Sequence, residues 1–510
     1  MIARTRFPKF DLFSAIPNAL VLGKELAWRL ETAATVMTAI PSAVVLGLSC
    51  IVPPAVAAPK PNIVYVLTDQ WRASAFGFAG DPNVKTPRLD KFAAQSVRFA
   101  NAVSVCPVCT PYRAALLTGR YPTSTGMFLN DLYLPDAELC MAEILKTAGY
   151  DTAYIGKWHL DGHGRFSFIP PERRQGFDYW KAAECDHEYN HSHYYAGTSP
   201  EKLYWPGYDA FAQTADAQQY LRDHAKSDKP FLLVMAYGAP HFPHASAPPE
   251  YQKLYPPDQL TLAPNVAAAR ANAARKELVG YYAHCSALDK CVGDLLDTLR
   301  ETGLADHTIV VFTSDHGEMM GAHDISPRMK QWPYDEAAHV PFLLYDPGVQ
   351  ARVVTTPIDT PDILPTLLGL TGVAVPKSVE GENLAAVVTG GGPGPDRAVL
   401  MMCVSPFIPD LIEYRGIRTG SHTYVRKLDG PWLMFDNIAD PYQLHNLVDD
   451  PASAGLQKQL DASLQAALKK IGDDFQPAQH YLDKFGYNIR PHDNISYDAN
   501  AKVVSPQPRK

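Results

Sequence analysis

The sequence has no excess of basic residues, because 46 Lys and Arg stand against 54 Asp and Glu, for a net charge of −8. Such a chain has little with which to neutralise a phosphate backbone, which argues against nucleic acid as a partner but leaves room for a local basic pocket. No repeat of the solenoid type is visible. The eight cysteines have spacings that fit neither a dense disulfide framework nor a zinc site. What remains is an ordinary globular composition in 510 residues, long enough for two domains.

The N-terminal segment differs from the rest of the chain in its long apolar run. Residues 33–52 are nearly all apolar or small, basic residues precede them, and residues 55–57 match the A-x-A pattern of a signal-peptide cleavage site. We therefore predict a signal peptide over residues 1–57 and an exported protein, periplasmic or secreted. The alternative is an uncleaved membrane anchor, since the run approaches the length that spans a bilayer.

Four continuous apolar runs have the character of strands that are buried on both faces of a sheet. They are Asn62–Leu67, Thr152–Ile155, Phe231–Ala236 and Thr308–Phe312. Helical patterns separate them at residues 137–148 and 278–299. This alternation predicts an α/β fold with a large, mostly parallel central sheet flanked by helices. Polar residues follow each strand, and such folds place their sites where the ends of parallel strands meet.

A run of glycine and proline at residues 390–395 marks the predicted domain boundary. It separates a catalytic domain at residues 58–390 from a smaller C-terminal α+β domain and tail at residues 396–510. Segments 418–425, 433–435 and 442–447 suggest short strands and turns in the smaller domain. The tail from Gly472 is expected to loop back over the surface.

The most informative motif is the C-x-P-x-R pentapeptide at residues 109–113. Proline is favoured at the first position of a helix, so we expect Pro111 to open a helix with Cys109 just before it. Free N–H groups and the helix dipole favour an anion there, and Arg113 adds a forked cation suited to a tetrahedral oxyanion. The pattern indicates a nucleophile at an anion site. The alternatives are a buried structural thiol and a redox pair, because Cys106 and Cys109 also form C-x-x-C.

Two of the predicted strands end in a pair of potential metal ligands. Asp69 and Gln70 follow the first strand, and Asp315 and His316 follow the last. A single Asp after a strand is usually a turn or a helix cap, but two such pairs at one sheet edge are less easily explained in that way. Carboxylate and amide oxygens with one imidazole suit a hard divalent cation such as Ca²⁺, Mg²⁺ or Mn²⁺.

These motifs closely resemble those of the formylglycine-dependent sulfatases, which have an alkaline phosphatase-like fold. The pentapeptide at residues 109–113 resembles the first signature of that family, and the segment Gly149–His159 resembles the second. The segment Pro240–Pro243 is similar to the family's P-H-x-P segment, and Lys330 stands where the family has a second sulfate-binding lysine. The resemblance runs from about residue 61 to residue 447 with all its motifs in order, which makes it specific.

The resemblance implies a formylglycine hydrate as the nucleophile, made from Cys109 by a formylglycine-generating or sulfatase-maturing enzyme. Together with that residue, Asp69, Gln70, Asp315 and His316 would ligate the metal. Ca²⁺ is the first choice, with Mg²⁺ and Mn²⁺ as alternatives. Many relatives have a second Asp in place of Gln70 and an Asn in place of His316, which leaves the choice of metal open.

The resemblance also implies a role for each remaining polar residue of the motifs. Lys157 and Lys330 would bind the sulfate group, and His241 would protonate the departing alcohol. His159 would be the base that expels sulfate and regenerates the aldehyde. The full set of residues implied in catalysis is Cys109, Arg113, Lys157, His159, His241 and Lys330.

The segment at residues 185–195 is dense in histidine and aromatic side chains. A metal cluster and ordinary surface histidines are two explanations. We favour a third, in which this loop, joined by Asp161, His163 and Arg165, stacks on and hydrogen-bonds a sugar. The predicted substrate is therefore a sulfated glycan. Two alternatives remain, namely a phosphonate monoester or phosphodiester hydrolase of the same superfamily, and a non-catalytic protein that binds sulfated glycans through an unmodified Cys109.

Overall fold

The computed structural model describes residues 60–390, 394–408, 410–491, 493 and 495. The predicted signal peptide at residues 1–57 lies outside this part of the chain, and so do residues 391–393 of the predicted domain boundary. Within the described ranges, no helix is both long and apolar enough to cross a membrane.

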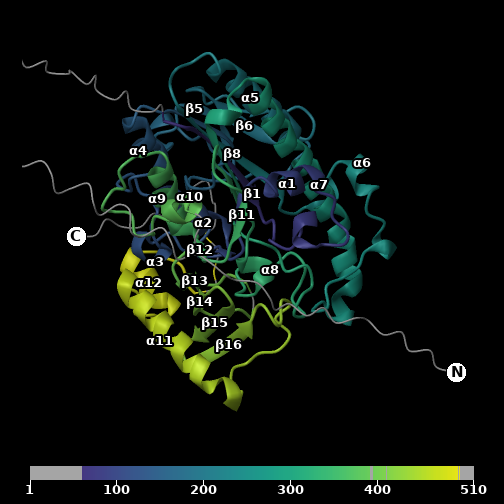
Figure 1. Ribbon diagram of the computed structural model, residues 1–510, viewed down its shortest axis with the longest axis vertical. Helices are drawn as coiled ribbons and strands as arrows, with labels where there is room; N and C mark the ends of the chain where they lie inside the picture. Colours follow the sequence, from purple (N-terminus) through teal and green to yellow (C-terminus); the bar gives the residue numbers. More distant parts are fainter. Residues whose placement is uncertain (1–59, 391–393, 409, 492, 494, 496–510) are drawn as a thin grey trace, which may run out of the picture. The chain divides into compact units, whose positions relative to one another are not determined.

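A ten-stranded sheet forms the centre of the fold, in the order β11-β2-β10-β9-β1-β8-β4-β5-β6-β7 (Figure 1). Five adjacent strands run parallel, namely β9 (Thr308–Ser314), β1 (Asn62–Asp69), β8 (Phe231–Pro240), β4 (Asp151–Lys157) and β5 (Tyr179–Ala183). Every residue of β1, β8 and β9 is buried, as expected for strands covered on both faces. The outer strands are β2 (Val97–Phe99), β6 (His193–Ala196), β7 (Leu203–Tyr204), β10 (Phe342–Tyr345) and β11 (Arg352–Val354). The predicted α/β fold with a large, mostly parallel sheet is confirmed.

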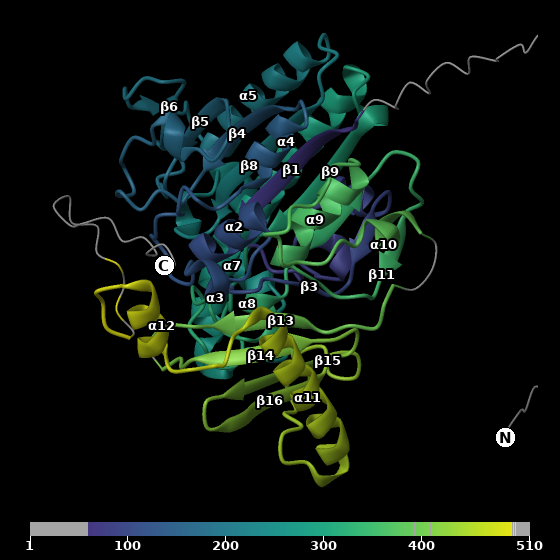
Figure 2. The same cartoon turned by 90° about the vertical axis from the view of Figure 1, so that its left-hand side faces the viewer.

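Helices cover both faces of this sheet (Figure 2). Successive side chains of each strand point to opposite faces, so each strand contributes to two buried clusters. Val64 and Val66 of β1 share one buried cluster with the helices of the first face, and Ile63 and Tyr65 share another with those of the second. The first face has α1 (Pro87–Ala93), α5 (Asp209–His224), α6 (Pro249–Gln252) and α7 (Ala271–Glu301). The second has α2 (Cys109–Thr118), α3 (Pro122–Thr125), α4 (Met141–Thr147), α9 (Thr360–Leu370) and α10 (Ala385–Thr389).

The two helices predicted from the sequence are both present, but their observed limits differ from the predicted ones. The helix predicted at residues 278–299 lies within the longer α7. The helix predicted at residues 137–148 begins only at Met141, because Cys140 caps it. The N–H of Cys140 donates to Oε2 of Glu143 at 2.8 Å, as in a capping box, which fixes the start of α4 at that point.

A second, four-stranded antiparallel sheet follows in the sequence. Its strands are β13 (Val399–Cys403), β14 (Tyr414–Arg418), β15 (His422–Lys427) and β16 (Gly430–Asp436), with α11 (Ala454–Ile471) packed on it. The predicted small C-terminal sheet is confirmed, but segment 418–425 is divided by a turn at residues 419–421. Three short elements complete the fold, namely β3 (Ala102–Val103), β12 (Ile358–Asp359) and α8 (Asp335–Ala338).

The tail, which was expected to loop over the surface, instead contains a helix, α12 (Ala478–Phe485). The rings of Tyr481 and Phe485 pack edge-on against Phe128, with centroid distances of 6.2 and 5.9 Å. The hydroxyl of Tyr487 donates to the carbonyl of Gly126 at 2.8 Å. α12 and Tyr487 therefore pack against the segment that follows α3.

Candidate active site

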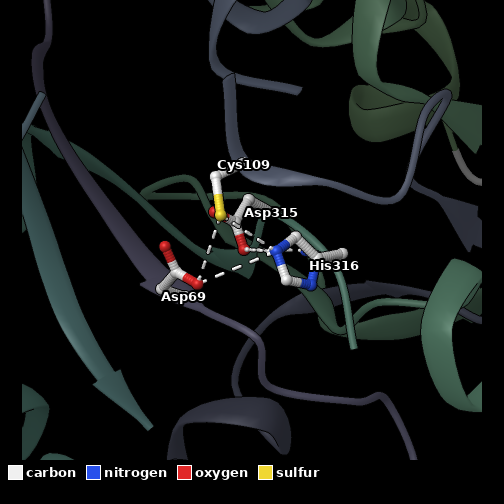
Figure 3. A group of neighbouring side chains, drawn as sticks. All are labelled: Asp69, Cys109, Asp315 and His316. Atoms are coloured by element: carbon white, nitrogen blue, oxygen red, sulfur yellow. Dashed lines mark hydrogen bonds and ion pairs between the residues drawn. The ribbon is translucent and has the colours of Figure 1, made fainter. Parts of the chain in front are cut away.

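Asp69 and Asp315 lie next to each other where two strands end (Figure 3). β1 and β9 are parallel neighbours with Thr68 opposite Ser314, so the residues that follow leave the sheet together. The N–H of Gln70 donates to Oδ1 of Asp315 at 3.0 Å and links the segments that follow β1 and β9. The structure therefore brings together the two pairs of strand-end residues that the sequence singled out.

Four buried side chains form one cluster at this edge, namely Asp69, Cys109, Asp315 and His316, whose ligand atoms all lie within 4.8 Å of one another. Cys109 Sγ is 3.3 Å from Nε2 of His316 and 3.8 Å from Oδ1 of Asp69. Nδ1 of His316 donates to the carbonyl of Gly317 at 2.9 Å, which leaves the lone pair of Nε2 directed at the cluster. Two carboxylates and an imidazole suit a divalent cation, so the donor set fits the metal that the sulfatase resemblance implies.

Arg113 and Lys157 surround the carboxylates with positive charge. Nη2 of Arg113 donates to Asp69 at 3.2 Å and to Asp315 at 3.1 Å, and Nζ of Lys157 donates to Asp69 at 2.7 Å. Burial acts to raise the pKa of Asp69, but the charges of Lys157, His241 and Arg113 hold it well below its usual value. Burial and the neighbouring Asp69 raise the pKa of Asp315 to about 6. The carboxylate of Asp69 is therefore firmly ionised, whereas that of Asp315 is harder to ionise, and a bound cation would favour its charged form.

Cys109 is the first residue of α2, and Val108 is its N-cap. Pro111 is consequently the third residue of the helix, not the first as predicted. Proline is tolerated there because the N–H groups of the first turn have no partner within a helix. All ten residues of α2 are buried, and Cys109 is 1% exposed.

The surroundings of Cys109 favour an anion. Burial and Asp69 act to raise the pKa of its thiol, but Lys157, Lys330 and His316 outweigh them and hold that pKa well below its usual value. Nζ of Lys330 is 3.4 Å from Sγ. The N-terminus of α2 contributes in the same direction.

Lys330 and His241 contact each other beside Cys109. Nζ of Lys330 donates to Oε1 of Gln70 at 3.2 Å and lies 3.0 Å from Nε2 of His241. The amide of Gln70 is thus directed at Lys330, and its role as a metal ligand stays a prediction. His241 follows the end of β8, and its Nδ1 is 2.7 Å from the carbonyl of Phe242.

The described hydrogen bonds of His159 involve its ring and its carbonyl. Its Nε2 is hydrogen-bonded to Asp131, which also binds Arg165, and its carbonyl accepts from the hydroxyl of Thr110 at 2.9 Å. Its Nδ1 is buried and has no hydrogen-bond partner among the described residues. Asp131 was missed by the sequence reasoning, because it belongs to a loop that has no periodic pattern.

The loop at residues 185–195 packs mainly on itself and its neighbours. His191, for example, stacks on Tyr204 with a centroid distance of 4.3 Å. In the described ranges, the only group of side chains placed to hold a metal is the one at Cys109, so the loop forms no metal cluster. His187 is different, because its ring stacks on that of His241 at 4.2 Å.

The three residues predicted to join this loop at a sugar are engaged in ion pairs. Asp161 is 2.7 Å from Nε of Arg173 and 3.1 Å from Nδ1 of His163. Arg165 is 3.0 Å from Asp131 and is thereby linked to His159. Arg165 is the member of this trio that has a connection to the candidate catalytic residues.

Cys106 is not paired with Cys109, since all the cysteines in the described part of the chain are free. Burial raises the pKa of Cys106 to about 12, which makes it a poor thiolate. Both observations speak against the redox alternative.

The large mixed sheet with helices on both faces, the small antiparallel sheet and the metal-ligand cluster at the strand ends define an enzyme of the alkaline phosphatase-like fold. A phosphonate monoester hydrolase of Agrobacterium radiobacter has this fold, with a TM-score of 0.64 at 21% identity over 81% of this chain and 96% of that chain. The family model described as Sulfatase matches residues 61–373, and the chain belongs to the sulfatase family. It is accordingly a sulfuric ester hydrolase. A second model, described as N-sulphoglucosamine sulphohydrolase, C-terminal, matches residues 327–470.

Individual relatives cover most of the chain. The ulvan-active sulfatase of Formosa agariphila is 54% identical over 84% of this chain and 85% of that protein. The endo-4-O-sulfatase of Bacteroides thetaiotaomicron is 32% identical over 84% of this chain and 96% of that protein. A solved structure from glycosaminoglycan metabolism in the same bacterium has a TM-score of 0.72 at 29% identity, over 83% of this chain and 98% of that chain.

Proposed function

We propose that this protein is an exported sulfatase that removes sulfate from a sulfated polysaccharide, with ulvan as the first substrate to test. The similarity to the ulvan-active sulfatase of Formosa agariphila supports this choice of substrate. The observation that carries the catalytic part is the position of Cys109, with its Sγ among three metal-ligand side chains and 3.4 Å from the ammonium group of Lys330. Export rests on the N-terminal sequence.

We propose that a maturing enzyme converts Cys109 to formylglycine, which supplies an aldehyde hydrate as the nucleophile. Asp69, Gln70, Asp315 and His316 would hold a divalent cation beside it, for which we favour Ca²⁺ over Mg²⁺ and Mn²⁺ because most of the donors are oxygens. When bound, the cation would add positive charge where negative charge develops in the reaction.

The chain's own residues would bind the sulfate group and move the protons. Lys157 and Lys330 neutralise its oxygens from either side of residue 109. His241 would protonate the departing alcohol through Nε2. Because Nε2 accepts a hydrogen bond from Lys330 in this structure, it has to take up that proton, from Lys330 or from solvent, before the alcohol leaves. His159 would take the proton from the remaining hydroxyl through its buried Nδ1 when sulfate leaves. It can do so only in its neutral form. Burial acts to lower the pKa of His159, but Cys185 and Asp131 outweigh it and raise that pKa to about 10.

The test combines mass spectrometry with an activity assay. The peptide that contains residue 109 is analysed from protein made in a host with a maturing enzyme, and sulfate release from ulvan oligosaccharides is measured on the same preparation. We expect formylglycine at position 109 and sulfate release that Cys109→Ala abolishes without changing the fold. An unconverted thiol in active protein would overturn the proposed nucleophile. Faster cleavage of an aryl phosphonate monoester than of the matched aryl sulfate would favour the phosphonate hydrolase instead.

A further inference from the structure

We propose that His187 is a positioning residue for His241, which it holds in the orientation needed to protonate a poorly leaving alcohol. The inference rests on the proposed function, because it takes His241 as the acid of that reaction. It assigns a role to one histidine of the loop at residues 185–195.

The hydrogen bonds of His241 fix its nitrogens but not the plane of its ring. Nδ1 donates to the carbonyl of Phe242 at 2.7 Å, and Nε2 accepts from Nζ of Lys330, 3.0 Å away. Both contacts lie at the edge of the imidazole, so the ring can still tilt about the line through them. A group stacked on its face removes that freedom.

His187 supplies this face contact. The two imidazole rings are 4.2 Å apart between centroids and only 16° from parallel, which is a stacked arrangement. His241 is 3% exposed and His187 is half-buried, so the stack is largely shielded from water. Nε2 of His187 lies 3.5 Å from Sγ of Cys185, which orients the stacked ring in turn.

Tyr189 links the loop at residues 185–195 to the end of β8. Its hydroxyl donates to the carbonyls of Gly238 and His241, at 3.0 and 2.9 Å. A Cβ at Gly238 would come within 3.0 Å of the Tyr189 ring, so the absence of a side chain there permits the close approach. The stack is therefore part of a defined junction between the loop and the end of β8.

The proposed role has a consequence that depends on the leaving group. Because Nε2 of His241 accepts a hydrogen bond from Lys330, it first has to take up a proton, from Lys330 or from solvent. As the bond from sulfur to the ester oxygen breaks, its electron pair stays on the oxygen, which takes that proton from Nε2. A sugar alcohol needs that proton, whereas an acidic phenol leaves readily without it. A loss of alignment at His241 should therefore slow the cleavage of poor leaving groups most.

The experiment measures kcat and KM for His187→Ala and His187→Phe in converted enzyme. Substrates are ulvan oligosaccharides and a series of aryl sulfates whose phenols differ in acidity. We expect His187→Ala to lower kcat on the oligosaccharide by about 10- to 100-fold with little change in KM, and to steepen the dependence on phenol acidity. His187→Phe retains a ring that can stack and should recover most of kcat.

His191 provides a matched control, since it is a stacked histidine of the same loop but contacts Tyr204 and not His241. His191→Ala should leave kcat on the aryl sulfates, and its dependence on phenol acidity, unchanged. The proposal is overturned if His187→Ala leaves kcat unaltered, raises only KM, slows all leaving groups equally, or has the same effect as His191→Ala. Absence of sulfate release by the converted wild-type enzyme would instead overturn the proposed function, and the role of His187 with it.

Discussion

At the scale of single residues, Arg113 holds the candidate site together. Its guanidinium binds Asp69 and Asp315 through one nitrogen and the carbonyl of Lys157 through another. The side chain is 2% exposed, so these contacts are made without competition from water. A lysine carries the same charge but has no rigid fork, and it cannot keep these contacts in the same geometry.

We expect Arg113→Ala to lower the free energy of unfolding by about 3–5 kcal/mol, because it removes the buried cation that Asp69 and Asp315 share. Chemical denaturation of the purified variants measures this. Arg120 is the control, since it pairs with Glu138 at a position that is 20% exposed, and Arg120→Ala should cost about 1 kcal/mol or less. Equal losses for the two variants would contradict the buried role of Arg113.

A second prediction at this scale concerns the metal. We expect one divalent ion per chain by elemental analysis, and its removal with a chelator should abolish activity until Ca²⁺ is restored. At a Ca²⁺ concentration 100 times the Kd, bound metal should add about 3 kcal/mol to the free energy of unfolding. Asp315→Asn should lower the metal content, whereas Asp209→Asn, at a buried aspartate outside the cluster, should not. Full metal content in Asp315→Asn would contradict the proposed ligand set.

At the scale of elements, the position of Lys157 depends on how closely β4 passes β8. Gly156, the residue before it, has a φ of 109°, which lies in the region that favours glycine. A Cβ at this position would lie 2.0 Å from the carbonyl oxygen of Ala236 in β8. The glycine thus permits the approach that directs the following lysine to Asp69.

We expect Gly156→Ala to be less stable than Gly149→Ala by about 1–3 kcal/mol, because overpacking adds to the backbone strain. Gly149 is a matched control, since its φ is 94° and a Cβ there would meet nothing within 4 Å. Thermal unfolding compares the two variants, and sulfate release should fall only in Gly156→Ala. If both variants were equally stable, the close approach of β4 to β8 would not be the cause.

The sequence could predict the helices and strands of the sheet, but it could not predict the irregular segments. Asp69 and Asp315 could be placed together because apolar runs identify parallel strands, whose ends share one edge. Asp131 and the stack of His187 on His241 depend on loops, whose paths follow from tertiary contacts and leave no period in the sequence. The helix α12 escaped prediction because its eight residues lie in a stretch rich in turn-forming residues.

At the scale of the whole molecule, a buried ion pair joins the segment before α12 to the second sheet. Nε of Arg415 in β14 is 2.6 Å from Oδ2 of Asp473, and both side chains are fully buried. Burial acts to raise the pKa of Asp473, but Arg415 and its hydrogen bonds hold that pKa below the usual value. The pair precedes α12, so it fixes where the last helix docks.

Because the folded pKa of Asp473 is lowered, the pair stabilises the fold fully above the unfolded pKa of about 4 and progressively less below it. We expect Asp473→Asn to cost about 3–5 kcal/mol at pH 7. The difference from the wild type should shrink as the pH falls below about 4, which urea unfolding at several pH values measures. Asp461→Asn, at a surface pair with Arg426, should have a smaller effect. A difference that is constant with pH would contradict the ion pair.

The burial of Cys109 also limits when the residue can be modified. In the folded chain this residue is 1% exposed, at the start of a helix whose residues are all buried, so a modifying enzyme cannot reach it. Its surroundings form late in synthesis, because β1 pairs with strands that begin at Phe231 and Thr308. The proposed conversion of Cys109 would therefore have to occur on a chain that has not yet folded, and the fraction of active enzyme would be set by a competition between the rate of modification and the rate of folding.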